Sequence, residues 1–363
     1  MGPLRGLKVI EMASIGPGPF AGMLLADLGA DVVRVEGRTS PVGIELDRRY
    51  DTMLRGRTAI RLDLKDPANV ATVLKLTAEA DVFIEGWRPG VAERLGVGPE
   101  DCLARNPRLI YGRMTGWGQH GPLASAPGHD INYLALSGAL HMVGRAGGPP
   151  TPPLNFVGDF GGGGMLLAFG VLAALWERTR SGCGQVVDAA MVDGASLLAT
   201  TFAGLFAAGL WTDERGTNLV DSGAPYYDAY ETADGRYIAI GAIENKFQDE
   251  LYRLLALDDL VGRPLAKCEW PQAKERVAAA IRKRTSEEWR QVFEGTDTCT
   301  SPVLTPNEAP LHPHNVARAT FVNIDGITQP APAPRFSRTS AEIPSAPADC
   351  VPVEDVLKAW GVT

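Results

Sequence analysis

A compact β-α-β pattern at the start of the chain constrains the fold more than any other feature. Residues 7–12 are predicted to form a buried strand, residues 19–28 follow a helical pattern that begins at Pro19, and residues 31–35 are predicted to form a second strand. A helical crossover between two neighbouring strands makes them parallel. The opening therefore predicts an α/β fold built on a parallel sheet.

The same alternation continues through the first half of the chain. Further strands are predicted at 59–62, 82–85, 109–114 and 185–188, and a helix is predicted at 67–80. Two longer apolar helices are predicted at 165–179, ahead of a Ser-Gly-Cys-Gly stop, and at 192–210. We therefore expect a Rossmann-like large domain.

A smaller α+β domain is predicted in the second half. Its signals are strands at 226–231 and 237–240 around a turn at Asp234-Gly235, followed by helices at 245–257, 271–285 and 286–294. A final amphipathic helix at 353–360 is expected to pack against the large domain. The predicted ranges are 1–189 for the first part of the large domain, 190–221 for a connector helix and linker, 222–313 for the small domain, 314–332 for a return linker, and 333–363 for the last part of the large domain.

Composition bounds the class of protein. A chain of 363 residues exceeds the roughly 250–300 residues at which single cores stop growing, which favours two domains. Its formal net charge of -8 argues against a nucleic-acid surface. The five cysteines show no C-x-x-C pair, so we expect no metal site and no disulfide framework. No signal-peptide pattern and no apolar run of about 18 residues is evident, so we expect a cytoplasmic protein without membrane insertion.

A dinucleotide-binding fingerprint is present in form at residues 16–21. Gly16 and Gly18 follow the first strand with the G-x-G-x-x-[GA] spacing, and Glu36 stands 20 residues after Gly16. In such sites main-chain N–H groups hold the pyrophosphate, and neither Pro17 nor Pro19 has one. A tight strand-to-helix turn with Pro19 at the first helical position explains the motif better than a nicotinamide site does.

Several short segments together carry a resemblance to a known family. They are residues 6–11, 26–33, 62–65, 88–91, 94–96, 113–119, 128–133 and 184–188. On these segments the chain resembles the family III CoA-transferases over about residues 4–340, and most closely their α-methylacyl-CoA racemase branch.

The resemblance implies an architecture and partners. The large domain is expected to bind coenzyme A on its Rossmann-like sheet, and the chain to cross to the small domain and return. Two chains are expected to interlock as a homodimer with each active site between domains of different subunits. The implied partners are an acyl-CoA thioester and a second copy of the chain. Coenzyme A enters as part of the substrate, and no separate cofactor is required.

The resemblance also assigns candidate catalytic residues. In the transferases an aspartate nucleophile stands where this chain has Asp159, whereas a Gly-His-Asp segment, here Gly128-His129-Asp130, marks the racemases. It also places a small-domain glutamate, here Glu244, in the site. A histidine and a carboxylate on opposite faces of one α-carbon can remove a proton and return one, which predicts interconversion of R and S 2-methylacyl-CoA thioesters by His129 and Asp159. Asp130 is expected to orient neighbouring groups or to cap a helix.

Main-chain N–H groups at a helix start near Asp130 are expected to stabilise the enolate oxygen. Glycines at 128 and 161–164 are expected to let the thioester approach the main chain. Arginine is the better partner for bidentate phosphate contacts, which points to Arg38, Arg88 and Arg94. The predicted coenzyme A contacts are Arg38, Leu62, Asp63, Lys65, Gly86, Trp87, Arg88, Arg94 and Tyr133.

Two other functions stay open. The first is CoA transfer to a carboxylic acid, with Asp159 forming a mixed anhydride and then a CoA thioester. The second is an acyl-CoA-binding dimer without catalysis. The apolar stripe of Met165, Leu166, Phe169, Leu172 and Leu175 is predicted to be core rather than part of an acyl tunnel.

Overall fold

The computed structural model describes residues 2–37 and 46–362, so the predicted contact Arg38 lies outside the described residues. The chain divides into two compact units. Unit 1 comprises Met1–Ser137, Leu154–Leu198 and Pro313–Thr363, and unit 2 comprises Gly138–Pro153 and Ala199–His312. Residues 138–153 thus group with unit 2, whereas the sequence placed them in the large domain.

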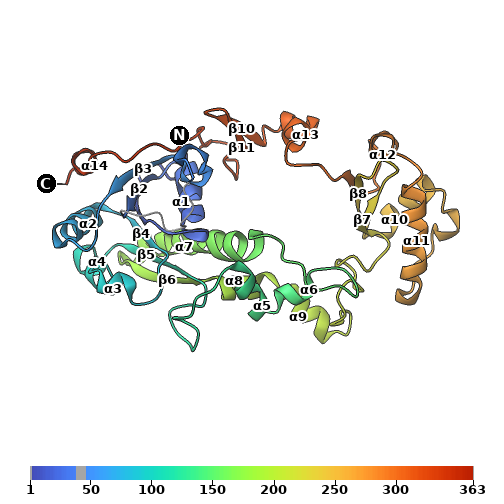
Figure 1. Cartoon of the computed structure of the whole chain (residues 1–363), viewed down its shortest axis with the longest axis horizontal. Helices are drawn as coiled ribbons and strands as arrows, with labels where there is room; N and C mark the ends of the chain where they lie inside the picture. The colour runs from blue at the N-terminus through green and yellow to red at the C-terminus, as the bar shows by residue number, and fades with distance from the viewer. Residues whose placement is uncertain (1, 38–45, 363) are drawn as a thin grey trace. The chain divides into compact units, whose positions relative to one another are not determined.

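Unit 1 is built on a six-stranded parallel sheet, as the opening pattern predicted (Figure 1). The strand order is β3-β2-β1-β4-β5-β6, which is a doubly wound arrangement with its switch point between β1 and β4. The strands are β1 at Lys8–Met12, β2 at Asp31–Glu36, β3 at Arg57–Arg61, β4 at Val82–Glu85, β5 at Ile110–Thr115 and β6 at Gln185–Ala190.

Alternate side chains of these strands enter two separate cores. Val9, Val82 and Ile110 point to one face, where they pack with helices α1 (Pro17–Asp27) and α7 (Leu166–Ser181). Ile10, Phe83 and Tyr111 point to the other face. That second core is covered by α2 (Pro67–Glu79), α4 (Pro99–Arg105) and α14 (Val353–Trp360). The predicted packing of the last helix on the large domain is confirmed, since Trp360 is 4 % exposed and its indole N–H donates to Asp31 at 2.8 Å.

The helix predicted at 165–179 begins earlier than expected. A π-helix, η3, spans Phe156–Met165 and runs into α7, so the glycine run is helical (Figure 1). A Cβ on Gly162 would lie 2.7 Å from the main-chain nitrogen of Ala195, and one on Gly164 would lie 2.7 Å from the carbonyl oxygen of Pro17. These glycines therefore let the main chain of η3 approach helices α8 (Met191–Leu198) and α1, and their expected role in substrate approach stays a prediction.

The single helix predicted at 192–210 is two helices. Helix α8 ends at Leu198, Ala199 separates it from α9 (Thr200–Ala207), and the boundary between the two units falls at the same place. Close packing of Gly194 of α8 on Gly162 of η3 explains why α8 stays with unit 1.

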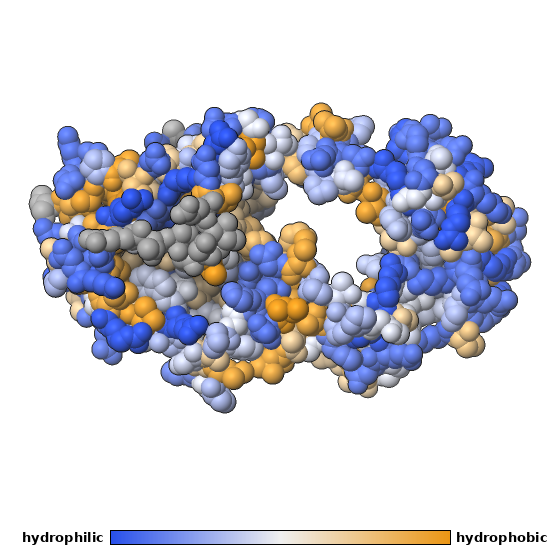
Figure 2. All heavy atoms as spheres, in the orientation of Figure 1, coloured by the Kyte–Doolittle hydropathy of each residue, from blue (hydrophilic) through white to orange (hydrophobic). Residues whose placement is uncertain are grey.

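Most of the apolar stripe predicted to be core is exposed within this chain. Met165, Phe169 and Leu172 are 57 %, 70 % and 37 % exposed, and the neighbouring Trp176 is 67 % exposed, whereas Leu175 packs against the first core. Figure 2 shows apolar surface over the part of unit 1 where α5 (Asp130–Leu136), α7 and α8 lie. The continuous helix Phe156–Ser181 is also long and apolar enough to cross a membrane by length and composition, although 39 % of that window is buried in the chain. The sequence analysis missed this span.

Unit 2 holds the predicted small α+β domain. Its antiparallel sheet has the order β7-β8-β9, with β7 at Tyr227–Glu231, β8 at Tyr237–Gly241 and β9 at Thr300–Pro302. Helices α10 (Asn245–Leu254), α11 (Trp270–Ile281) and α12 (Ser286–Phe293) supply most of the remaining core. The remaining short helices are α3 at Val91–Arg94 and α13 at Pro313–Ala317 in unit 1 and α6 at Ala139–Met142 in unit 2, and a hairpin of β10 (Phe321–Ile324) and β11 (Ile327–Pro330) lies in unit 1.

Buried ion pairs connect β1, β2, β3 and helix α1 within unit 1. Glu11 is fully buried and accepts from Arg57 Nη1 at 2.6 and 2.9 Å and from Arg34. Arg55, 3 % exposed, forms a bidentate pair with Asp27 at 2.6 and 3.0 Å and donates to Gln329 at 2.8 Å. Through Arg55 the returning segment 313–363 is held to helix α1.

We expect Arg55→Met to lower the free energy of unfolding by about 3–5 kcal/mol, because it leaves the Asp27 carboxylate buried without its partner. Chemical denaturation followed by circular dichroism measures the change. The matched control is Arg282→Met, whose ion pair with Glu231 is largely exposed and whose loss should cost no more than about 1 kcal/mol. Equal denaturation midpoints for the two variants would contradict the prediction.

Candidate active site

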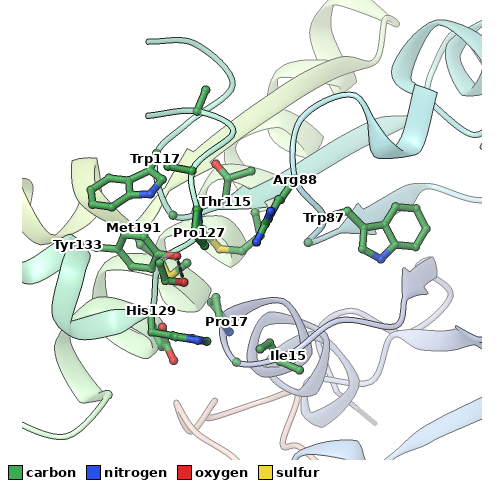
Figure 3. A pocket seen from close by; sticks show the side chains of 18 of the residues that line it. Ile15, Pro17, Trp87, Arg88, Thr115, Trp117, Pro127, His129, Tyr133 and Met191 are labelled. Carbon is green, nitrogen blue, oxygen red and sulfur yellow. Dashed lines mark hydrogen bonds between the residues drawn. The ribbon is translucent and has the colours of Figure 1, made fainter. Parts of the chain in front are cut away.

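A pocket of about 300 Å³ lies in unit 1 at the carboxyl ends of β1, β4 and β5 (Figure 3). Its walls come from the loops after these strands, from the start of α5 and from η3. Ligands of doubly wound folds bind at this edge of the sheet, where neighbouring loops diverge. Both His129 and Asp159 line the pocket, so the structure brings together the two residues predicted to transfer protons.

His129 directly precedes helix α5. It is the N-cap residue, with φ −133° and ψ 173°, and its side chain is exposed. Figure 3 shows the ring at the pocket, on the side opposite Trp87. The carbonyl oxygen of His129 accepts from the main-chain N–H of Asn132 at 2.8 Å, which closes the first turn of the helix.

Asp130 connects the two halves of the site. Its carboxylate is 8 % exposed, and Oδ1 accepts from the main-chain N–H of Asp159 at 2.7 Å. Burial raises the pKa of Asp130, while hydrogen bonds from the main chain of Asp159 and Gly158 oppose that rise. Asp130 therefore orients the Asp159 segment, which is the first of the two roles expected for it.

Asp159 lies in the first turn of η3 and is half-buried. Burial raises the pKa of its carboxyl; the Asn155 amide, which donates to Oδ2 at 3.3 Å, and the nearby His129 lower it. A carboxyl with a raised pKa is a stronger base when ionised and a better proton donor near neutral pH. Asp159 and His129 both line the same pocket.

An aromatic wall supports the His129 loop. Tyr133 is 6 % exposed, its hydroxyl donates to the carbonyl oxygen of Gly128, and the ring of Trp117 meets it edge-on with centroids 4.8 Å apart. A Cβ on Gly116 would overlap the Tyr133 ring, and one on Gly128 would lie 2.8 Å from it. Glycine at 128 thus makes room for Tyr133. Burial raises the pKa of Tyr133 to about 12, so its hydroxyl stays protonated at neutral pH.

The predicted coenzyme A contacts follow the ends of β3 and β4. Gly86, Trp87, Arg88 and Tyr133 line the pocket, and Arg88 forms no ion pair within the described ranges. Figure 3 shows the Arg88 and Trp87 side chains projecting in opposite directions, and the Trp87 indole N–H donates to Ala13 at 3.3 Å.

The predicted contacts after β3, which are Leu62, Asp63 and Lys65, and the contact Arg94 after β4 do not line this pocket. Lys65 is exposed, and Asp63 accepts from its main-chain N–H at 3.1 Å. Arg94 ends the short helix α3. Leu62 packs in the second core, so only its main chain is left for a ligand.

Glu244 lies in unit 2, apart from the other predicted catalytic residues along the chain. It is the exposed N-cap residue of α10, and its carbonyl oxygen accepts from Phe247 and Gln248 at 3.0 and 3.1 Å. Its expected place beside His129 therefore stays a prediction. Within residues 2–37 and 46–362, no group of three or more His, Cys, Asp or Glu side chains is arranged to hold a metal ion.

Sequence analysis missed Asn155, Trp117 and Met191. Asn155 stands four residues before Asp159, a spacing that brings side chains together on a helix, but the glycine run hid that helix. Trp117 lies within a segment that carried the resemblance, yet its place in the pocket depends on the turn after β5. Met191 belongs to a helix that nothing in its local sequence links to the pocket.

Comparison with known proteins decides the family. A model of the CoA-transferase family III matches residues 4–352. The chain belongs to the family III CoA-transferases. The resemblance found in its sequence is thereby confirmed.

Family III relatives of two kinds match nearly the whole chain. The mouse protein named alpha-methylacyl-CoA racemase is 46 % identical over 99 % of this chain and 93 % of its own length. The human protein of the same name is 42 % identical over the same shares. The human succinyl-CoA:glutarate CoA-transferase is 30 % identical over 93 % of this chain and 81 % of its own length.

Solved family III structures share the fold. A CaiB/BaiF family protein from Brucella suis matches with a TM-score of 0.82 and 26 % identity, covering 99 % of both chains. A hypothetical protein from Mycobacterium tuberculosis matches with a TM-score of 0.80 and 30 % identity, covering 96 % of this chain and 97 % of that one. The α/β fold predicted for this chain is therefore confirmed.

We expect Asn155→Ala to raise the pKa of Asp159 further, because the amide hydrogen bond stabilises the ionised carboxylate. Carbon-13 NMR of the carboxyl signals across a pH titration measures the shift, with Asp159→Asn identifying the signal. Asn323→Ala is the control, since Asn323 lies in the β10–β11 hairpin. An unchanged or lowered pKa of Asp159 would show that the Asn155 amide does not stabilise the charge.

Proposed function

We propose that the chain is an α-methylacyl-CoA racemase, an isomerase that interconverts the R and S forms of 2-methylacyl-CoA thioesters. The observation that carries the proposal is the pairing of His129 and Asp159 in one pocket, with Asp130 bonded to the main chain of Asp159. The names and the identity of the mouse and human relatives support it.

His129 and Asp159 carry the two proton transfers. Each acts as base toward one epimer and as acid toward the other, and each positioned group contributes about 10² to 10⁴ in rate. Removal of the α-proton puts negative charge on the thioester oxygen. The main-chain N–H groups of Asp130 and Ile131 begin α5 and have no acceptor among the described residues, so they are suited to receive this charge. One such donor contributes about 2.7–4 kcal/mol.

Coenzyme A binds along the carboxyl ends of β2, β3 and β4 as part of the substrate. Arg88 is the best-placed cation, because it lines the pocket and has no ion-pair partner in the described part of the chain. Arg38, Lys65 and Arg94 follow β2, β3 and β4 and are proposed to meet the phosphates. No further cofactor takes part.

The working form is an interlocked homodimer. The exposed face of α7, with Phe169 and Trp176, is an apolar surface of the kind that partner subunits cover. Glu244 from unit 2 of one subunit is proposed to reach His129 of the other and to hold its imidazole. A cytoplasmic location, without nucleic-acid binding or membrane insertion, belongs to the same proposal.

CoA transfer is the alternative, since Asp159 stands at the nucleophile position of the transferases. The presence of His129 favours racemisation, because transfer through an acyl anhydride needs no second proton acceptor on the opposite face.

We expect the protein to incorporate deuterium at the α-carbon of a single 2-methylacyl-CoA epimer in deuterated water, with no carboxylic acid added. NMR or mass spectrometry follows the exchange. His129→Ala should slow racemisation by at least about 10²-fold, with the dissociation constant for coenzyme A changed by less than about twofold. The controls are His120→Ala, which lies outside the pocket and should exchange normally, and Arg88→Ala, which should weaken coenzyme A binding about tenfold.

Absence of exchange by the wild-type protein, together with passage of coenzyme A to an added carboxylic acid, would establish the transferase alternative. Absence of both activities, with coenzyme A still bound, would leave a binding dimer.

We expect subunits carrying His129→Ala and Glu244→Ala to complement each other when they are produced together. If Glu244 acts on the partner subunit, one site of the mixed dimer loses both groups and the other keeps both. Two affinity tags isolate the mixed dimer, and its racemisation rate should approach half that of the wild type. A mixed dimer as inactive as either parent would place both groups in the same subunit.

A further inference from the structure

Two hydrogen bonds hold the peptide plane between Gly128 and His129, one at its C=O group and one at its N–H group. The Gly128 carbonyl oxygen accepts from the Tyr133 hydroxyl, and the His129 N–H donates to Asn132 Oδ1 at 3.0 Å. Both partners belong to the first turns of α5. Because the C=O and N–H of one peptide point in opposite directions, two bonds of this kind fix the orientation of the plane.

That orientation decides where the imidazole is presented. The peptide plane before a residue sets its φ, here −133°, and φ with ψ sets the direction of the Cα–Cβ bond. His129 is exposed, so packing around the ring does not aim it. Within its own chain, His129 is therefore directed mainly by its main-chain conformation.

Tyr133 is itself held firmly. Its ring is buried, meets Trp117 edge-on, and fills space that is free only because residues 116 and 128 are glycines. A buried aromatic ring loses little further conformational entropy when its hydroxyl forms a hydrogen bond. The bond from Tyr133 to the Gly128 carbonyl oxygen is therefore preorganised. Figure 3 shows Tyr133 next to His129 at the same side of the pocket.

We propose that Tyr133 and Asn132 are positioning residues that aim His129 by clamping the Gly128–His129 peptide, independently of any contact with the substrate. The inference rests on the proposed racemase function, because it assigns the clamp to one of the two proton-transfer groups. Asp159 lies on a different segment and takes its orientation from Asp130 and Asn155. Loss of the clamp should therefore impair one face of the α-carbon and spare the other.

The test compares deuterium exchange from the two epimers in Tyr133→Phe and Asn132→Ala. In a two-base site the epimer served by Asp159 can still lose its proton and regain a deuteron on the same face, whereas the epimer served by His129 cannot. We expect the rate from one epimer to fall about 10²-fold, as for a misplaced catalytic group. The other rate should change less than about threefold, and racemisation should fall from both sides.

Tyr230→Phe is the matched control. The Tyr230 hydroxyl also donates to a carbonyl oxygen five residues earlier, that of Pro225 at 2.6 Å, and it is equally buried, but it lies in unit 2 away from the pocket residues along the chain. It should leave the ratio of the two exchange rates unchanged.

A second measurement does not depend on catalysis. Both bonds of the clamp restrain the His129 amide, so its hydrogen exchange, followed by nitrogen-15 NMR, should quicken about tenfold in either variant and stay unchanged in Tyr230→Phe. If the wild-type protein shows no deuterium exchange at the α-carbon, the proposed function fails. The amide-exchange measurement would still show whether Tyr133 and Asn132 restrain the Gly128–His129 peptide.

Two results would overturn the inference. Equal loss of exchange from both epimers with weaker coenzyme A binding would make Tyr133 a ligand-binding wall. Unchanged α-exchange in both variants, despite a freed His129 amide, would mean that the peptide plane does not aim the ring.

Discussion

The hydrogen bond from the Asp159 main chain to the buried Asp130 carboxylate is the contact on which the pocket depends. It joins two segments 29 residues apart, one ending in His129 and the other opening the helical glycine run. A half-buried helix start exposes unbonded N–H groups, and a carboxylate from another helix is a strong way to satisfy one of them. The same bond thereby gives a main-chain N–H group in the first turn of η3 an acceptor, and it helps to set the relative position of the two proton-transfer groups.

The fold was largely predictable because its signals are local. Residues 82–84 are apolar and fully buried, as expected for a central parallel strand, and helix α2 begins at Pro67 directly after an Asp66 cap. The predictions of secondary structure failed where packing between segments distant in the sequence determines the conformation. Glycines 161–164 have poor helix propensity, yet they are helical because α1 and α8 press against them and leave no room for side chains. Nothing near residue 199 marks a break between α8 and α9.

In the candidate site, too, residues within short motifs could be predicted, whereas residues brought in by distant packing could not. His129, Asp159 and Asp130 could be named because short motifs carry them, and the pocket brings them together. Asn155 could have been found by its helical spacing to Asp159 only if the glycine run had been predicted as helix. The exposure of Phe169 on α7 could not be predicted for a different reason. An apolar helix face is expected to be buried, but its sequence does not show whether the same chain or another copy of the chain buries it. The Leu62 side chain packs in the second core, so its predicted contact with coenzyme A is left to its main chain and stays a prediction.

Helix α14 completes the second core of unit 1 from the far end of the chain. Trp360 bonds to Asp31, its carbonyl oxygen accepts from Lys8 at 3.1 Å, and Val356 packs with Ile10 and Phe83. During synthesis on the ribosome, this face of the sheet is covered by α2 and α4 but lacks α14 until the whole of unit 2 has been translated. The second core is therefore complete only after the last helix has been made, and until then Ile10 and Phe83 lack part of their packing.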